Sequence, residues 1–144
     1  MLNDYNVKAV NDAYKNAHIA MQSISDLLPD VKDEGLKKEL SGEFKGYETH
    51  INDISAFMKE HDIKPHDIGA FKKAIMKGSI KMKTLFDDSK NQIADMMLKG
   101  TVNGINELSQ MKNERENLDE NVENLISELL KTEESYEKRL RKYL

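Results

Sequence analysis

The sequence predicts an all-α protein built from four amphipathic helices. The chain has 144 residues, of which 33% are charged and only two are Pro, and it contains no Trp. Strand-rich domains use more aromatic and β-branched residues, and more turns, than this composition provides. Apolar residues recur every three or four positions along four segments, which is the pattern of helices that bury one face. A chain of this length is expected to form one domain around one core.

The first two helices are predicted at residues 2–28 and 33–61. Pro29 ends the first helix because the residue before a proline disfavours helical backbone angles. Asp33 and Glu34 suit the positive N-terminal end of the second helix. The connection is short, so the two helices are expected to form an antiparallel hairpin. The inward faces comprise Val7, Val10, Tyr14, Ala17, Met21, Ile24 and Leu28 in the first helix, and Leu36, Leu40, Glu43, Tyr47, His50, Ile51 and Ile54 in the second.

A long, partly helical crossover is predicted at residues 62–88. Pro65 lies in the break, and a weaker amphipathic segment follows at 68–86. A connection of this length can run along a whole bundle at about 1.5 Å per helical residue, which makes the second and third helices parallel. One continuous helix over 68–112 is the alternative, but the acidic capping cluster at 87–89 favours a break.

The third and fourth helices are predicted at residues 89–112 and 118–143, with a polar turn between them. The fourth helix begins with acidic side chains and ends with basic ones, an order that suits the helix dipole. Methionines at core spacing indicate packing rather than a copper or haem site. The inward faces comprise Ile93, Met96, Met97, Gly100, Gly104, Leu108 and Met111 in the third helix, and Leu118, Val122, Leu125, Leu129, Thr132, Glu133, Tyr136, Leu140 and Tyr143 in the fourth.

The composition argues against several classes of protein. There is no Cys, so a disulfide framework or a thiolate site is excluded. A net charge of −4 argues against binding to nucleic acid, which requires positive charge opposite the phosphates. No apolar run is long enough for a membrane span, and the start of the chain lacks the basic and apolar regions of a signal peptide. No phosphate-binding loop or nucleophile elbow occurs. The expected location is therefore the cytoplasm.

Four segments resemble the small, uncharacterised bacterial ferritin-like proteins. They are residues 36–40 (LKKEL), 47–50 (YETH), 93–105 (IADMMLKGTVNGI) and 130–134 (LKTEE). The resemblance extends over most of the chain and implies a ferritin-like four-helix bundle, although none of these motifs defines an activity.

Active ferritin-like proteins hold a di-iron or di-manganese centre, with a Glu from each of two helices and Glu-x-x-His from each of the other two. In this sequence His50 matches the His position, but Tyr47 stands where the Glu is expected. The first helix offers Tyr14 and His18 in place of a Glu. The fourth helix has several glutamates, including Glu133, but no His. The resemblance therefore implies the fold without an intact metal centre.

The favoured interpretation is a core filled by the rings of Tyr14, Tyr47 and Tyr136, with Gly100-x-x-x-Gly104 as a notch that admits a ring or a neighbouring backbone. The protein would then be no enzyme and would need no cofactor. It would act as a structural, binding or stress-associated protein. Self-association into a homodimer is part of this hypothesis. The candidate apolar edge consists of Phe57, Met58 and Phe71.

Two alternatives follow from other residues. One is a metal-binding oxidoreductase or ferroxidase that holds Fe or Mn with a non-standard ligand set. Those ligands would be His18, Glu43, Tyr47, His50, Glu133 and Tyr136. The other is an adaptor whose lysine-rich crossover binds an acidic protein partner or a membrane surface. His61 and His66, with Asp62, are expected in an exposed loop that binds Zn or Ni adventitiously.

Overall fold

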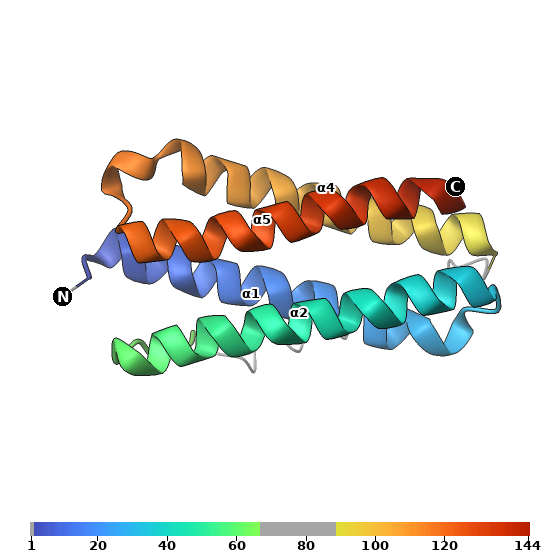
Figure 1. Cartoon of the computed structure of the whole chain (residues 1–144), viewed down its shortest axis with the longest axis horizontal. Coiled ribbons are helices and arrows are strands. Elements are labelled where there is room, and N and C mark those ends of the chain that lie inside the picture. The colour runs from blue at the N-terminus through green and yellow to red at the C-terminus, as the bar shows by residue number, and fades with distance from the viewer. Residues whose placement is uncertain (1, 67–88) are drawn as a thin grey trace.

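Residues 2–66 and 89–144, which the computed structural model describes, form four long α-helices that lie along a common axis (Figure 1). The helices are α1 (Asp4–Leu27), α2 (Glu34–Glu60), α4 (Lys90–Asn113) and α5 (Glu120–Leu140). Short 3-10 turns follow three of them, at Leu28–Asp30, Arg115–Asn117 and Arg141–Tyr143. The predicted all-α four-helix bundle is thus confirmed, with the ends of the first and last helices wound as 3-10 turns instead of α-helix.

Three of the helices begin at side chains that cap the backbone. Asn3 accepts a hydrogen bond from the N–H of Asn6 at the start of α1. Asp33 accepts from the N–H of Leu36 at 2.8 Å, and Asp119 caps α5. Such caps satisfy amide groups that have no partner inside the helix. They explain why the predicted starts lie close to the observed ones.

The end of α2 is set by its own backbone. Asp62 adopts a left-handed conformation with φ of 54°, and the N–H of Ile63 donates to the carbonyl of Met58 at 2.7 Å. This is the hydrogen-bond pattern of a Schellman motif, and the burial of Ile63 supplies the apolar contact that often accompanies it. The helix therefore ends before Pro65, as predicted, but the proline is not what ends it.

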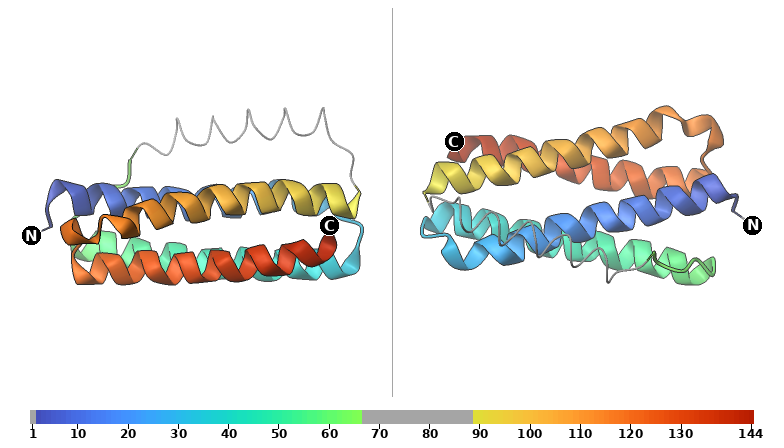
Figure 2. Two further views of the ribbon diagram at one scale, coloured as in Figure 1. Left: turned by 90° about the horizontal axis from the view of Figure 1, so that it is seen from above. Right: turned by 180° about the vertical axis from the view of Figure 1, so that it is seen from behind.

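The helices form two antiparallel hairpins, α1 with α2 and α4 with α5, which pack on each other. α2 and α4 run in the same direction, so the predicted parallel arrangement is confirmed (Figures 1 and 2). Ser89 has an extended backbone, with φ of −65° and ψ of 149°, and α4 starts after it. One continuous helix over 68–112 is therefore wrong. The predicted helical segment at 68–86 lies outside the described residues.

The inward faces predicted from the sequence contribute to the core, with one exception. Gly100 is exposed, and Thr101 is buried in its place. Met58, predicted at an exposed apolar edge, is 2% exposed, while Phe57 is partly buried and packs against the core. Phe71 lies outside the described residues. Phe57 and Met58 therefore pack into the bundle rather than form an exposed apolar edge.

No helix in the described ranges is both long enough and apolar enough to cross a membrane.

Candidate functional site

The middle of the bundle contains a layer of buried polar side chains from α2 and α5. We call Glu43, Tyr47, Glu133 and Tyr136 the central polar layer. Their exposed fractions are 0%, 0%, 1% and 6%, respectively. The two phenol rings meet edge to face, with centroids 5.3 Å apart and an angle of 65° between their planes. Side chains expected on two separate inward faces are therefore brought together between α2 and α5.

A glycine on α2 makes room for one of these rings. A Cβ atom at Gly46 would collide with the hydroxyl oxygen of Tyr136. The sequence predicts that Gly100 and Gly104 form the notch that admits a ring. In the described part of the chain, neither position has a ring among its nearest neighbours. No atom of the described residues lies within 4 Å of a Cβ at Gly100, so none of these residues requires a glycine there. A Cβ at Gly104 would lie 2.7 Å from Glu133 Oε1, so that glycine admits a carboxyl group rather than a ring.

Glu43 lies beside a second carboxyl group and near one cation. Glu39, one turn earlier on α2, forms an ion pair with Arg139, with Nε 3.2 Å from Oε2. The Arg139 guanidinium also lies over the Tyr136 ring, 5.1 Å from its centroid. Burial, followed by the neighbouring Glu39, raises the pKa of Glu43 to about 10. The Arg139 charge opposes this shift without overcoming it.

Glu133 lies at the other side of the central polar layer and contacts three helices. The Tyr47 hydroxyl hydrogen-bonds to it from α2, and Gly104 of α4 and Asn16 of α1 lie against its Oε1 side. Burial, reinforced by the charge of Glu107, raises the pKa of Glu133 to about 8, although the bond from Tyr47 acts in the opposite direction. Burial and the two nearby carboxyl groups also raise the pKa of Tyr47. The phenol therefore stays protonated and donates.

The histidines proposed as metal ligands make other contacts. His50 Nε2 lies 2.8 Å from Thr132 Oγ1, which joins α2 to α5, and burial lowers the pKa of the imidazole. His18 packs edge to face against the Tyr14 ring, with centroids 4.5 Å apart. His61 stacks on Phe57, and its Nδ1 lies 3.0 Å from the Phe57 carbonyl oxygen.

A dinuclear centre needs carboxylates and imidazoles that converge on the same two cations. In the described part of the chain, no three His, Asp or Glu side chains come together in a group that could hold a metal ion. The carboxyl groups of Glu43 and Glu133 lie among the phenol rings of Tyr47 and Tyr136, and His50 hydrogen-bonds to Thr132. The non-standard ligand set predicted from the sequence therefore does not fit a di-iron or di-manganese centre. His61, Asp62 and His66, predicted to bind Zn or Ni, likewise do not come together in such a group.

Three buried asparagines on α1 were not anticipated. Asn6 donates to the carbonyl of Asn117 and accepts from the N–H of Asp119, at 3.2 and 2.7 Å. Asn11 accepts from the backbone N–H of His66 at 3.0 Å, and Asn16 donates to the Gly104 carbonyl at 3.2 Å.

A signal for them exists in the sequence. Asn is a poor residue for a helix interior, because its side chain competes for backbone groups. Asparagines inside a long predicted helix therefore indicate tertiary hydrogen bonds.

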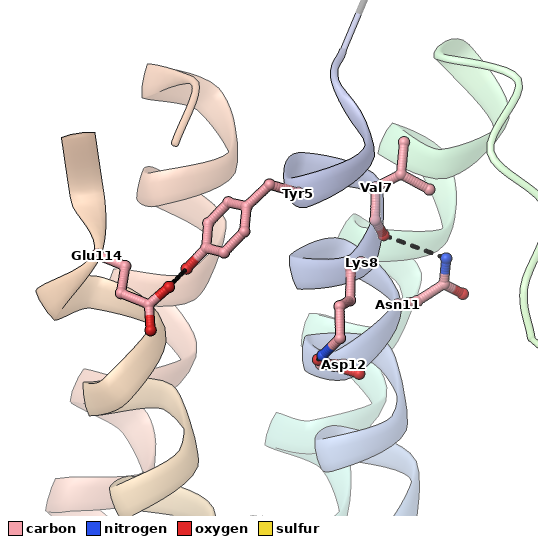
Figure 3. A network of polar contacts seen from close by, with 6 residues as sticks. All are labelled: Tyr5, Val7, Lys8, Asn11, Asp12 and Glu114. Carbon is pink, nitrogen blue, oxygen red and sulfur yellow. Dashed lines mark hydrogen bonds and ion pairs between the residues drawn. The ribbon is translucent and has the colours of Figure 1, made fainter. Parts of the chain in front are cut away.

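A surface groove of about 600 Å³ lies between α1 and α4. The Tyr5 hydroxyl donates to Glu114 at 2.7 Å, and Lys8 pairs with Asp12 at 2.7 Å, as Figure 3 shows. Groups of both signs line the groove, and two of them, Lys8 and Asp12, are paired with each other. The lining consists of Tyr5, Lys8, Ala9, Asp12, Lys15, Glu107, Gln110, Met111 and Glu114.

Comparison with models of protein families matches none of them, and comparison with curated proteins finds none with significant similarity. The class defined by the fold is that of all-α four-helix bundles.

Proposed function

We propose that the chain is a ferritin-like bundle without a di-metal centre, which works as a structural or binding protein rather than as an oxidoreductase. The parallel α2 and α4, joined by one long connection, support the ferritin-like part of this proposal. The observation that carries the metal-free part is the central polar layer. Two phenol rings pack against each other beside the two buried carboxyl groups, and the His50 imidazole on α2 bonds to Thr132.

The chemistry of the donors supports the same conclusion. Metal ligands must be deprotonated, and binding competes with protons for the same atoms. The pKa values of Glu43 and Glu133 are raised to about 10 and about 8, mainly by burial. A cation would therefore have to displace protons from these carboxyl groups in order to bind at neutral pH.

The test is metal analysis of protein prepared without a histidine tag, before and after exposure to Fe(II) and Mn(II) and removal of the excess. We expect no stoichiometric Fe or Mn and no acceleration of Fe(II) oxidation. The matched variant is His50→Ala, which we expect to behave like the wild type. Stoichiometric metal that His50→Ala abolishes would instead support the oxidoreductase with a non-standard ligand set. The mass in solution, measured on the same samples, distinguishes a monomer from the proposed homodimer.

A further inference from the structure

Several buried oxygen atoms in and beside the central polar layer have no hydrogen-bond partner in the described part of the chain. Among the described residues, neither oxygen of Glu43 has a hydrogen-bond partner, nor do Glu133 Oε1 and Asn16 Oδ1. Glu39 Oε2 is also without a hydrogen bond, although it forms the ion pair with Arg139. Leaving a buried polar atom without a partner is unfavourable, and native cores rarely do so.

We propose that Glu43 and Glu133 are both neutral carboxylic acids in the folded protein. Glu43 donates its proton to Glu39, and Glu133 donates its proton to Asn16. Hydrogen bonds from these two protons then stabilise the middle of the bundle, in the space where a metal centre does not fit. Both protons are released when the bundle unfolds at neutral pH.

The orientation of Asn16 carries the argument for Glu133. Its Nδ2 donates to the Gly104 carbonyl, which directs Oδ1 away from that bond. Glu133 Oε1, Asn16 Nδ2 and Asn16 Oδ1 lie 2.7, 3.2 and 3.4 Å from the position of a Cβ on Gly104, so the carboxyl group and the Asn16 amide reach the same small space. Two acceptors can bond only if one of them carries a proton. An amide oxygen does not, so the proton belongs to Glu133.

The position of Arg139 carries the argument for Glu43. Glu39 and Glu43 are four residues apart on one helix, a spacing that brings side chains together. Arg139 pairs with Glu39, whose side chain is 13% exposed, while Glu43 is fully buried. The negative charge of the pair is therefore best held by Glu39. The proton lies on Glu43, which can donate it to the neighbouring carboxylate.

Within residues 2–66 and 89–144, the groups that face each acid do not provide a second cation. Glu43 faces Glu39 and Tyr47 from its own helix, and Tyr136 and Arg139 from α5. Glu133 faces Tyr47 from α2, Glu107 from α4 and Asn16 from α1. Arg139 is the cation among these groups, and it is already paired. The remaining charged neighbours are carboxyl groups, which disfavour a second negative charge.

The protonation of these two groups determines how the stability of the fold changes with pH. Both pKa values rise above the ordinary 4.5, to about 10 for Glu43 and about 8 for Glu133, so the folded state binds more protons than the unfolded state. Stability is then fully present at mildly acidic pH and declines as the pH rises. Each group raises the unfolding equilibrium constant about tenfold per pH unit until its folded pKa is passed. Two groups give about a hundredfold per unit between pH 5 and 8.

The experiment is denaturant unfolding of the wild type, Glu43→Gln and Glu133→Gln between pH 5 and 9. Glutamine keeps the shape and donates from its amide to the same acceptors, but it does not titrate. In each variant, the rise of the unfolding equilibrium constant with pH should be about tenfold smaller per pH unit than in the wild type. At pH 8 each variant should therefore unfold less readily than the wild type. The matched control is Glu134→Gln, which changes an exposed neighbour and should keep the wild-type slope.

Infrared spectroscopy of the folded wild type at pH 7 gives a second readout that does not need a variant. The carbonyl stretch of protonated carboxylic acids should be present and should weaken in each Gln variant that folds. Absence of that band in metal-free protein would refute the inference, as would Gln variants with the wild-type pH slope. Either result leaves the proposed function standing, because the samples contain no metal. Bound metal in the earlier test would overturn the proposed function instead.

Discussion

The two ends of the bundle and its middle are stabilised in different ways. Near the start of α2, the core consists of aliphatic side chains such as Ile24, Leu36 and Leu40, all fully buried. In the central polar layer, phenols and carboxyl groups are buried just as deeply. The aliphatic layers depend on volume and on area removed from water. The polar layer depends on which donor meets which acceptor, so it fixes how α2 and α5 are aligned rather than how tightly they pack.

The largest expected effect tests the aliphatic end of this comparison. Leu40→Ala removes a fully buried side chain and leaves a cavity, so we expect a loss of about 3 kcal/mol in the free energy of unfolding. Denaturant unfolding at pH 6 measures it. Ile19→Ala is the control, since Ile19 is 39% exposed and should change stability by less than about 0.5 kcal/mol. Equal losses in both variants would show that the core is not where the structure places it.

The next effect tests a polar contact away from the middle. Asn6→Ala removes the partner of the Asn117 carbonyl and of the Asp119 N–H, so we expect a loss of about 2 kcal/mol. Amide hydrogen exchange should also become faster at Asp119. Asn103→Ala, at an exposed position of α4, is the control and should leave that amide unchanged. Unchanged exchange in Asn6→Ala would contradict the assigned bond.

The third prediction compares two glycines of α2. Gly46→Ala places a methyl group where the Tyr136 hydroxyl lies, and overpacking of this kind costs about 1–3 kcal/mol. Gly42→Ala, one turn earlier, meets no atom of the described residues within 4 Å and should gain about 0.5–1 kcal/mol from helix propensity alone. The Tyr136→Phe background should reduce the loss in Gly46→Ala, because it removes the atom that collides. A loss that persists unchanged there would indicate another cause.

The smallest effect is expected for the corresponding pair on α4. Gly104→Ala approaches the carboxyl end of Glu133, which can shift more easily than a ring, so the net loss should be about 1 kcal/mol. Gly100→Ala has no neighbour within 4 Å in the described ranges and should gain up to about 1 kcal/mol. Thermal unfolding of the two variants, measured side by side, decides the order. A gain in both would mean that Glu133 does not lie against Gly104.

Much of the fold could be predicted from the sequence. The period of the apolar residues placed Leu36, Leu40 and Ile54 inside, and it also placed the polar Glu43 and Tyr47 there. The period alone shows which side of a helix faces the core. It does not show how far each helix is rotated or shifted against its neighbours.

The missed features all depend on that rotation and shift. Gly46 was overlooked because only the alignment of α2 with α5 brings Tyr136 against it. Gly100 was placed inside because it continues the spacing of three and four, but the observed turn of α4 buries Thr101 instead. Asn16 acquires its role from Gly104 and Glu133, which lie on two other helices. No pattern within one segment encodes such a contact.

The hydrogen bonds of Asn6 have a consequence for the order in which the chain can assemble. Asn6 belongs to the first helix, yet it completes the turn that joins the last two, across a separation of 113 positions. During synthesis that turn stays unfinished until the chain has left the ribosome as far as Asp119. The first turn of the first helix therefore lacks this contact until the second hairpin is present. A shortened chain without either part cannot form the contact that closes this end of the molecule.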